Sequence, residues 1–236
     1  MSPTKALFWK EWRQMQWRWI FSLAMCCTIV FVGLKTRVLP DQMIILFSFG
    51  ISAFLIPLFI AMGLVAEERE QDSLRMQLGL PVTARQIYVV KMAIGTLAVA
   101  IPAVVCSIIA LLMAGNREKT SVDIIRIYGF AVPFGIVFML WTVVFSMKRK
   151  TQWAAALTGM VILAVWVFLI ICEDVFLLEV GEVHWDLSLI ITPFGFLEAG
   201  LDKGHWLATS IVQSILAMIL FWWGMRRFSM LTRSGR

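Results

Sequence analysis

Charged residues are scarce in this chain. They make up 15% of its 236 residues, compared with about 25% in a typical soluble domain, whereas hydrophobic residues make up 60%. The mean hydropathy of +0.84 points in the same direction. This composition excludes an ordinary water-soluble domain and predicts an integral membrane protein. The net charge of +6 is spread between apolar blocks and does not gather on one soluble face, so we expect no nucleic-acid partner.

Residues that build metal or catalytic sites are also few. The two histidines lie far apart, and the four cysteines have no CxxC spacing and sit in apolar runs or at their ends. The GxxxxGK[ST] pattern of an ATP-binding P-loop is absent from the sequence. We therefore expect no catalytic residue, no metal site and no directly bound cofactor, and we do not expect an enzyme. The alternative is an intramembrane enzyme built at the outer rim from Glu173, Asp174, His184 and Asp186.

Six apolar runs contain no charged residue and no histidine, and a helix needs about 20 such residues to cross a bilayer. The first run has only 16 residues, but Trp17 and Lys35 at its two ends can extend it to the membrane interfaces. We interpret this run as a retained span and not as a signal peptide. The sequence thus predicts an all-α integral membrane protein with six transmembrane helices. The six runs are Trp19–Leu34, Gln42–Ala66, Met92–Asn116, Ile127–Met147, Thr151–Cys172 and Trp206–Met225.

The lack of ionisable side chains in these runs narrows the possible functions. An ion-driven transporter needs a titratable relay or coordinating carboxylates within the membrane, and the runs offer neither. Energy for any transport must then enter from another polypeptide, through a cytoplasmic surface. Pro57, Pro102 and Pro133 interrupt the second, third and fourth runs and predict kinks in those helices.

The basic residues between the runs predict the orientation of the chain. With the N-terminus inside, the inside segments hold 15 Lys and Arg residues and the outside segments hold 6. The positive-inside rule therefore predicts a multi-pass protein of the cytoplasmic (inner) membrane with both termini in the cytoplasm.

Two segments are expected to lie at the membrane surface. The sequence FWKEWRQMQWRW, residues 8–19, has apolar side chains that mostly share one helical arc. We interpret residues 1–18 as an interfacial amphipathic helix before the six-span domain at 19–236. The alternative is that this helix simply extends the first span. The outer segment 173–205 contains an apolar stretch of 15 residues that is broken by Pro193 and Gly195, so we expect a short re-entrant or interfacial segment before helix six. The expected membrane-interface residues are Trp9, Trp12, Trp17 and Trp19.

A dense polar segment separates the second and third runs. Six of the ten residues from Ala66 to Arg75 are charged, and no helix breaker separates them from the second run. Gly79 and Pro81 then end any helix that continues from the membrane. The following TARQ sequence, Thr83–Gln86, predicts a capping box, in which Thr83 caps a new helix and Gln86 reaches back to it. We expect a helical elbow below the membrane.

The residues of this elbow resemble a known family. The pattern A-E-E-R-E-x-x-S-L…L-P-V-T-x-x-Q-I-x-x-x-K at Ala66–Lys91 is similar to the signature of type-2 ABC transporter permeases, the transmembrane subunits of ABC exporters. Six spans, an amphipathic N-terminal helix and a broken outer segment before the sixth span also fit that family. The motif covers 26 residues, and Asp72 stands where the family often has glycine.

The resemblance implies a permease subunit that binds no cofactor of its own. Its cytoplasmic coupling loop, residues 67–91, would dock on a separate ABC ATPase subunit, which carries the P-loop and uses ATP and Mg. A second permease subunit, in a homodimer or a heterodimer, would complete the path across the bilayer. The resemblance assigns ATPase coupling to Glu67, Glu68, Arg69, Glu70, Ser73, Leu74, Pro81, Thr83 and Gln86. The alternative function is a membrane scaffold or sensor that docks a cytoplasmic partner and transports nothing.

Overall fold

A computed structural model describes six stretches of the chain, and these stretches are helical almost throughout. They contain no strand, and they cover residues 3–36, 47–66, 82–114, 118–149, 151–177 and 206–234. The long helices are α1 (Pro3–Thr36), α6 (Ala84–Ala114), α7 (Glu118–Ser146), α8 (Gln152–Leu177) and α11 (Trp206–Ser234). In the second apolar run, residues 47–50 are helical and three short elements follow: the π-helix η1 (Ile51–Leu55), α3 (Ile56–Ala61) and the π-helix η2 (Met62–Ala66).

Five helical segments of the described residues are long and apolar enough to cross a membrane. This confirms the predicted all-helical class and agrees with the prediction of several transmembrane helices. The sixth apolar run lies in α11, a helix of 29 residues that also carries Arg226 and Arg227. The five segments are Thr4–Val32, Phe47–Leu64, Ala84–Leu112, Tyr128–Ser146 and Gln152–Leu169.

The helix α1 is continuous from Pro3 to Thr36. No glycine or proline occurs between Pro3 and Gly33, so nothing in the local sequence interrupts it. Residues 3–18 therefore form one helix with the first apolar run, as the alternative interpretation expected. The placement of its first turns in a membrane interface stays a prediction.

The second apolar run is not a regular α-helix. The π-helix η1 directly precedes α3, which has Pro57 in its first turn, and α3 passes into η2 six residues later. Proline has no backbone N–H and its ring crowds the preceding turn, and widened π turns are a common response to such a defect. At Pro57, where the sequence predicted a kink, the structure has π-helical turns on both sides of α3. Pro102 and Pro133 lie inside α6 and α7, which continue through them.

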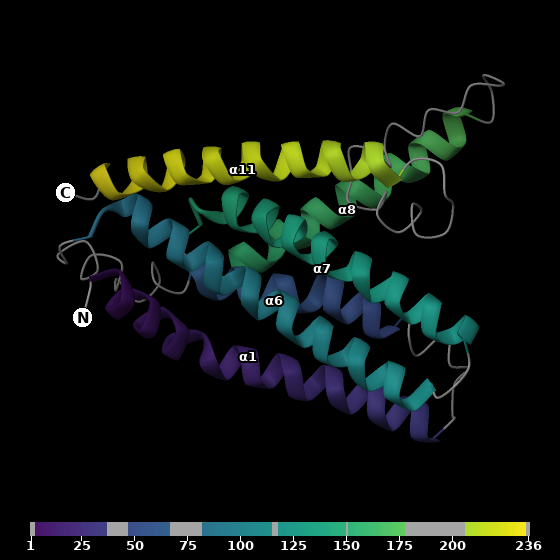
Figure 1. Ribbon diagram of the computed structural model, residues 1–236. Coiled ribbons are helices and arrows are strands. Elements are labelled where there is room, and N and C mark those ends of the chain that lie inside the picture. The colour runs from purple at the N-terminus through teal and green to yellow at the C-terminus, as the bar shows by residue number, and fades with distance from the viewer. Residues whose placement is uncertain are drawn as a thin grey trace.

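The helices form a bundle with α6 and α7 at its centre. In Figure 1, α1 runs beside α6, α7 lies next to α6, and α11 crosses the opposite side, with both termini at one end of the bundle. Close approach at the centre depends on Gly135 of α7. A Cβ there would lie 2.9 Å from Val99 Cγ1 and 3.0 Å from Pro57 Cγ, so the absent side chain lets three spans meet.

Aromatic side chains fill one part of the interior. Phe134 of α7 packs edge-on against Phe54 of the second span at 4.8 Å and against Trp166 of α8 at 6.3 Å between ring centroids. Such edge-to-face pairs contribute stability in addition to that from the burial of apolar area. Trp166 is a buried contact of α8, whereas most of the other large side chains described in that helix are exposed.

Candidate functional site

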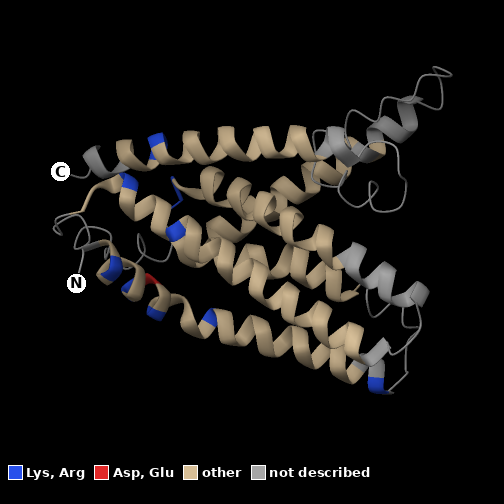
Figure 2. Ribbon diagram, viewed as in Figure 1, with Lys and Arg blue, Asp and Glu red and all other residues tan. Residues whose placement is uncertain are grey.

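The charged side chains of the described residues gather at one end of the bundle. Figure 2 shows Lys and Arg along the first half of α1, at the start of α6, just after α7 and near the end of α11, and these parts lie together at the end that holds both termini. Lys35 in the last turn of α1 marks the opposite end, and Glu11 is the single acidic residue among the described side chains. We call this region the basic end. It comprises Lys5, Lys10, Glu11, Arg13, Arg18, Arg85, Lys91, Lys148, Arg149, Arg226 and Arg227.

The predicted capping box lies at this end and is confirmed. The Thr83 backbone N–H donates to Gln86 Oε1 at 2.9 Å, and the Gln86 N–H donates to Thr83 Oγ1 at 3.3 Å. Two backbone donors at the start of α6 are therefore satisfied reciprocally. The other residues assigned to ATPase coupling lie outside the described residues: Glu67, Glu68, Arg69, Glu70, Ser73, Leu74 and Pro81.

A buried ion pair joins α6 to α1 two turns after the cap. Lys91 Nζ lies 2.6 Å from Glu11 Oε2, and the two side chains are 1% and 3% exposed. Lys10 Nζ lies 3.8 Å from the other carboxylate oxygen. Removing one member of a buried pair leaves a desolvated charge and typically costs about 3–5 kcal/mol. The pair therefore holds the start of α6 firmly against the first turns of α1.

Sequence reasoning missed this pair, although each partner carries a signal. Glu11 lies midway between Leu7 and Met15, at helical spacing, and both of these neighbours are buried. Lys91 continues the buried stripe of α6 that starts at Ile87. One basic and one acidic residue on the buried stripes of two helices are expected to pair, because lone buried charges are rare.

Arg18 fastens α1 to two further spans. Its Nη1 donates to the Phe59 carbonyl at 2.9 Å, its Nη2 donates to Gln152 Oε1 at 3.2 Å, and its guanidinium lies 4.9 Å from the Phe59 ring centroid. Phe59 lies three residues before η2 begins, so this contact meets the second span next to the point where its helical spacing widens. Gly63 makes room for the guanidinium, since a Cβ there would lie 2.8 Å from Arg18 Cζ. Arg18 thus supports the irregular part of the second span.

Tyr88 links α6 to α11 on the opposite side. It is fully buried between Phe221 and Phe228, with ring centroids 5.4 and 5.8 Å apart, and its hydroxyl lies against Gly224. Arg227 Nη1 also donates to the Val144 carbonyl of α7 at 3.3 Å. The first two turns of α6 therefore contact α1 through Lys91 and α11 through Tyr88.

The four predicted interface tryptophans lie on different sides of α1. Trp9 and Trp17 are exposed, whereas Trp12 and Trp19 pack partly against the core, with ring centroids 5.6 Å apart. The outward pair is available to lipid or to an interface, and the inward pair contributes to packing.

The metal-ligating side chains and the thiols of the described part of the bundle can be placed individually. In it, no three His, Cys, Asp or Glu side chains are placed to hold a metal ion. Cys26 and Cys106 are buried in the core as free thiols, and Cys26 Sγ lies 3.8 Å from Ser52 Oγ. The described contacts at the basic end join α6 to α1 and α11. No family model matches the chain, and no curated protein matches it in sequence.

Proposed function

We propose that this protein is the six-span permease subunit of an ATP-driven export complex of the type-2 ABC kind. It crosses the cytoplasmic membrane with both termini inside, pairs with a second permease subunit, and is driven by a separate ATPase subunit that carries a P-loop. The observation that carries the proposal is the polar segment Ala66–Lys91, which resembles the coupling element of that family. The basic end supports the orientation, because this segment returns to the membrane at the end where the described basic side chains gather.

The contacts of α6 support a mechanical role for this segment. The capping box starts α6 at Ala84, so the polar segment passes directly into a helix with a well-defined first turn. Within two turns, Tyr88 and Lys91 contact α11 and α1. A push from an ATPase on residues 67–86 would thus reach three helices at once. Since these contacts are buried and specific, we expect the helices to move together at this end.

Charge reversal tests the proposal. We expect the double variant Glu67→Lys/Glu68→Lys to insert normally but to lose its ATPase, because the docking surface changes sign. The tagged chain is purified from its native membranes in mild detergent, and P-loop proteins that accompany it are identified by mass spectrometry. The double variant Glu173→Lys/Asp174→Lys is the matched control, since it makes the same charge change in the predicted outer segment.

The outcomes separate transport from the scaffold alternative. Capture of a P-loop ATPase by the wild-type chain and the control, with loss of that ATPase in the Glu67/Glu68 variant, supports coupling. Capture of an ATPase that is unaffected by the charge reversal contradicts the assigned docking surface. A wild-type chain whose partner lacks a P-loop contradicts the permease and favours the scaffold.

A further inference from the structure

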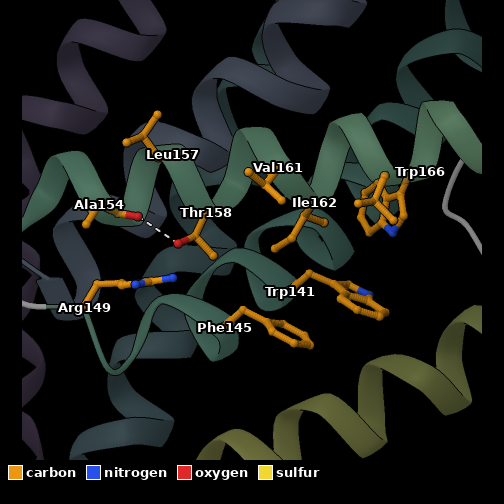
Figure 3. A pocket seen from close by; sticks show the side chains of 10 residues that line it. Trp141, Phe145, Arg149, Ala154, Leu157, Thr158, Val161, Ile162 and Trp166 are labelled. Carbon is orange, nitrogen blue, oxygen red and sulfur yellow. Dashed lines mark hydrogen bonds between the residues drawn. The ribbon is translucent and has the colours of Figure 1, made fainter.

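A groove of about 480 Å³ lies between α7 and α8 at the basic end of the bundle. Its walls are mainly apolar and aromatic, as Figure 3 shows, and include Trp141 and Phe145 on α7 and Leu157, Val161 and Trp166 on α8. The Thr158 hydroxyl donates to the Ala154 carbonyl at 2.8 Å, so the polarity of this side chain is satisfied within α8.

One charged side chain lines this groove, and it lies at the mouth. Arg149 follows the end of α7, where its backbone N–H donates to the Ser146 carbonyl at 2.8 Å. Its exposed side chain reaches along the mouth of the groove toward Thr158 (Figure 3). A cation at one end of an apolar slot is complementary to an amphiphile that has an anionic head and a hydrocarbon chain.

The length of the groove agrees with one leaflet of a bilayer. From Ala154 to Val165 the wall formed by α8 rises about 16 Å. Half of a hydrocarbon core is about 15 Å thick. With Arg149 at the basic end, a chain in this slot would start at the headgroup level of the cytoplasmic leaflet and end near the midplane.

The aromatic wall is already assembled. The rings of Trp141 and Phe145 stack with centroids 5.4 Å apart and an angle of 4° between their planes, and Trp166 meets Trp141 edge-on at 5.7 Å. A preformed wall reduces the entropy that a ligand must overcome on binding.

A second groove provides an internal comparison. It lies between α1 and the second span and has a volume of about 260 Å³. Its lining is Ser22 and apolar side chains such as Phe21 and Met25, without any charged residue. Any lipid can cover such a surface, so charge selectivity is expected in the α7–α8 groove and not in this one.

We propose that the α7–α8 groove binds an anionic phospholipid of the cytoplasmic leaflet, with one acyl chain in the slot and the phosphate paired with Arg149. This inference rests on the membrane placement of the chain and is independent of coupling to an ATPase. Guanidinium groups bind phosphates through charge-assisted hydrogen bonds.

The test uses the purified full-length chain in vesicles that contain equal amounts of phosphatidylglycerol and phosphatidylcholine. One lipid at a time carries a photoreactive group on its acyl chain, and cross-linked peptides are mapped by mass spectrometry. We expect phosphatidylglycerol to label the peptide with Leu157 and Val161 about fivefold more than phosphatidylcholine, because one basic residue contributes about that factor at an anionic surface. The groove between α1 and the second span should be labelled equally by both lipids.

Variants identify the groups responsible. In the α7–α8 groove, Arg149→Gln should make labelling by the two lipids equal, whereas Arg149→Lys should keep most of the preference for phosphatidylglycerol. Arg13→Gln, which changes an exposed residue of α1, should leave the preference unchanged. Val161→Trp should reduce labelling by both lipids, while unchanged labelling of the groove between α1 and the second span shows that the bundle is intact. A preference that survives Arg149→Gln would overturn the proposal. A groove that neither lipid labels would also overturn it and would indicate that a protein surface, such as a second copy of the chain, covers this face.

Discussion

The helices α6 and α8 are both long and apolar, yet the bundle holds them in different ways. In the apolar stretch of α6, 44% of the residues are buried, compared with 17% in that of α8. A capping box, an ion pair and a buried tyrosine fix the first turns of α6. The helix α8 packs against the bundle through Trp166 and small residues. Figure 1 shows that it diverges from the other helices along its length. Specific polar contacts thus mark α6 as a central element, whereas the outward face of α8 is left to lipid or to another protein.

The largest expected effect on stability comes from removing the carboxylate of the buried Glu11–Lys91 ion pair. Glu11→Ala should destabilise the protein by about 3–5 kcal/mol, because Lys91 would keep a desolvated charge. The free energy of unfolding is measured by titration with a denaturing detergent. The matched control is Lys10→Ala, whose exposed ammonium lies farther from the carboxylate and should contribute less than about 1 kcal/mol.

A double variant separates the effect of charge from the effect of packing in the same ion pair. Glu11→Leu/Lys91→Leu should recover most of the stability lost by Glu11→Ala, since apolar replacement of a buried pair is often nearly neutral. Equal destabilisation by the single and double changes would mean that the shape of the two side chains, and not their charge, holds α1 to α6.

The next largest effect on the free energy of unfolding is expected at the contact between α6 and α11. A Cβ at Gly224 would collide with the Tyr88 hydroxyl and lie 2.9 Å from Val144 Cγ2, so Gly224→Ala should cost about 1–3 kcal/mol. The same titration measures this cost, and Tyr88→Phe should relieve part of it. Gly129→Ala is the control, because nothing lies within 4 Å of its Cβ position. Stability gained or unchanged in Gly224→Ala would contradict the tight seating of Tyr88.

Loss of the helix cap should have a smaller, local effect. Thr83→Ala removes the acceptor of the Gln86 N–H and should cost about 1 kcal/mol, whereas Thr83→Ser should keep the cap. Hydrogen–deuterium exchange provides the readout: we expect faster exchange in the first turn of α6 and unchanged exchange near Gly135 of α7. A uniform increase across both helices would show that the cap supports the whole bundle.

The smallest effect is expected on α8. Leu157 is 62% exposed, so Leu157→Ala should change the free energy of unfolding by no more than about 0.5 kcal/mol. A loss of several kcal/mol would place this side chain in an interface with another subunit in the purified protein, and would remove the contrast between α6 and α8.

Part of this architecture was predictable because it depends on local sequence. Apolar runs without charge predicted membrane-spanning helices, and the TARQ sequence predicted the cap of α6 at the correct residues. The buried face of α1 was not predictable in the same way. The apolar arc that includes Trp9 faces outward in part, whereas the bundle buries the stripe with Glu11. In a membrane the lipid-facing surface is apolar too, so hydrophobicity does not distinguish it from the helix interface.

By itself, the sequence determined that the chain forms apolar helices and that the helix with the third run starts with a capped turn, and it predicted that the basic residues favour one side of a membrane. These properties follow from hydropathy, backbone capping and charge counts, which act over a few residues. Only the tertiary structure decided that Glu11 pairs with Lys91, that Arg18 reaches the Phe59 carbonyl, and that Arg149 stands at the mouth of a groove. Such contacts depend on how helices distant in sequence are rotated and shifted against one another, and that register is a property of the packed bundle.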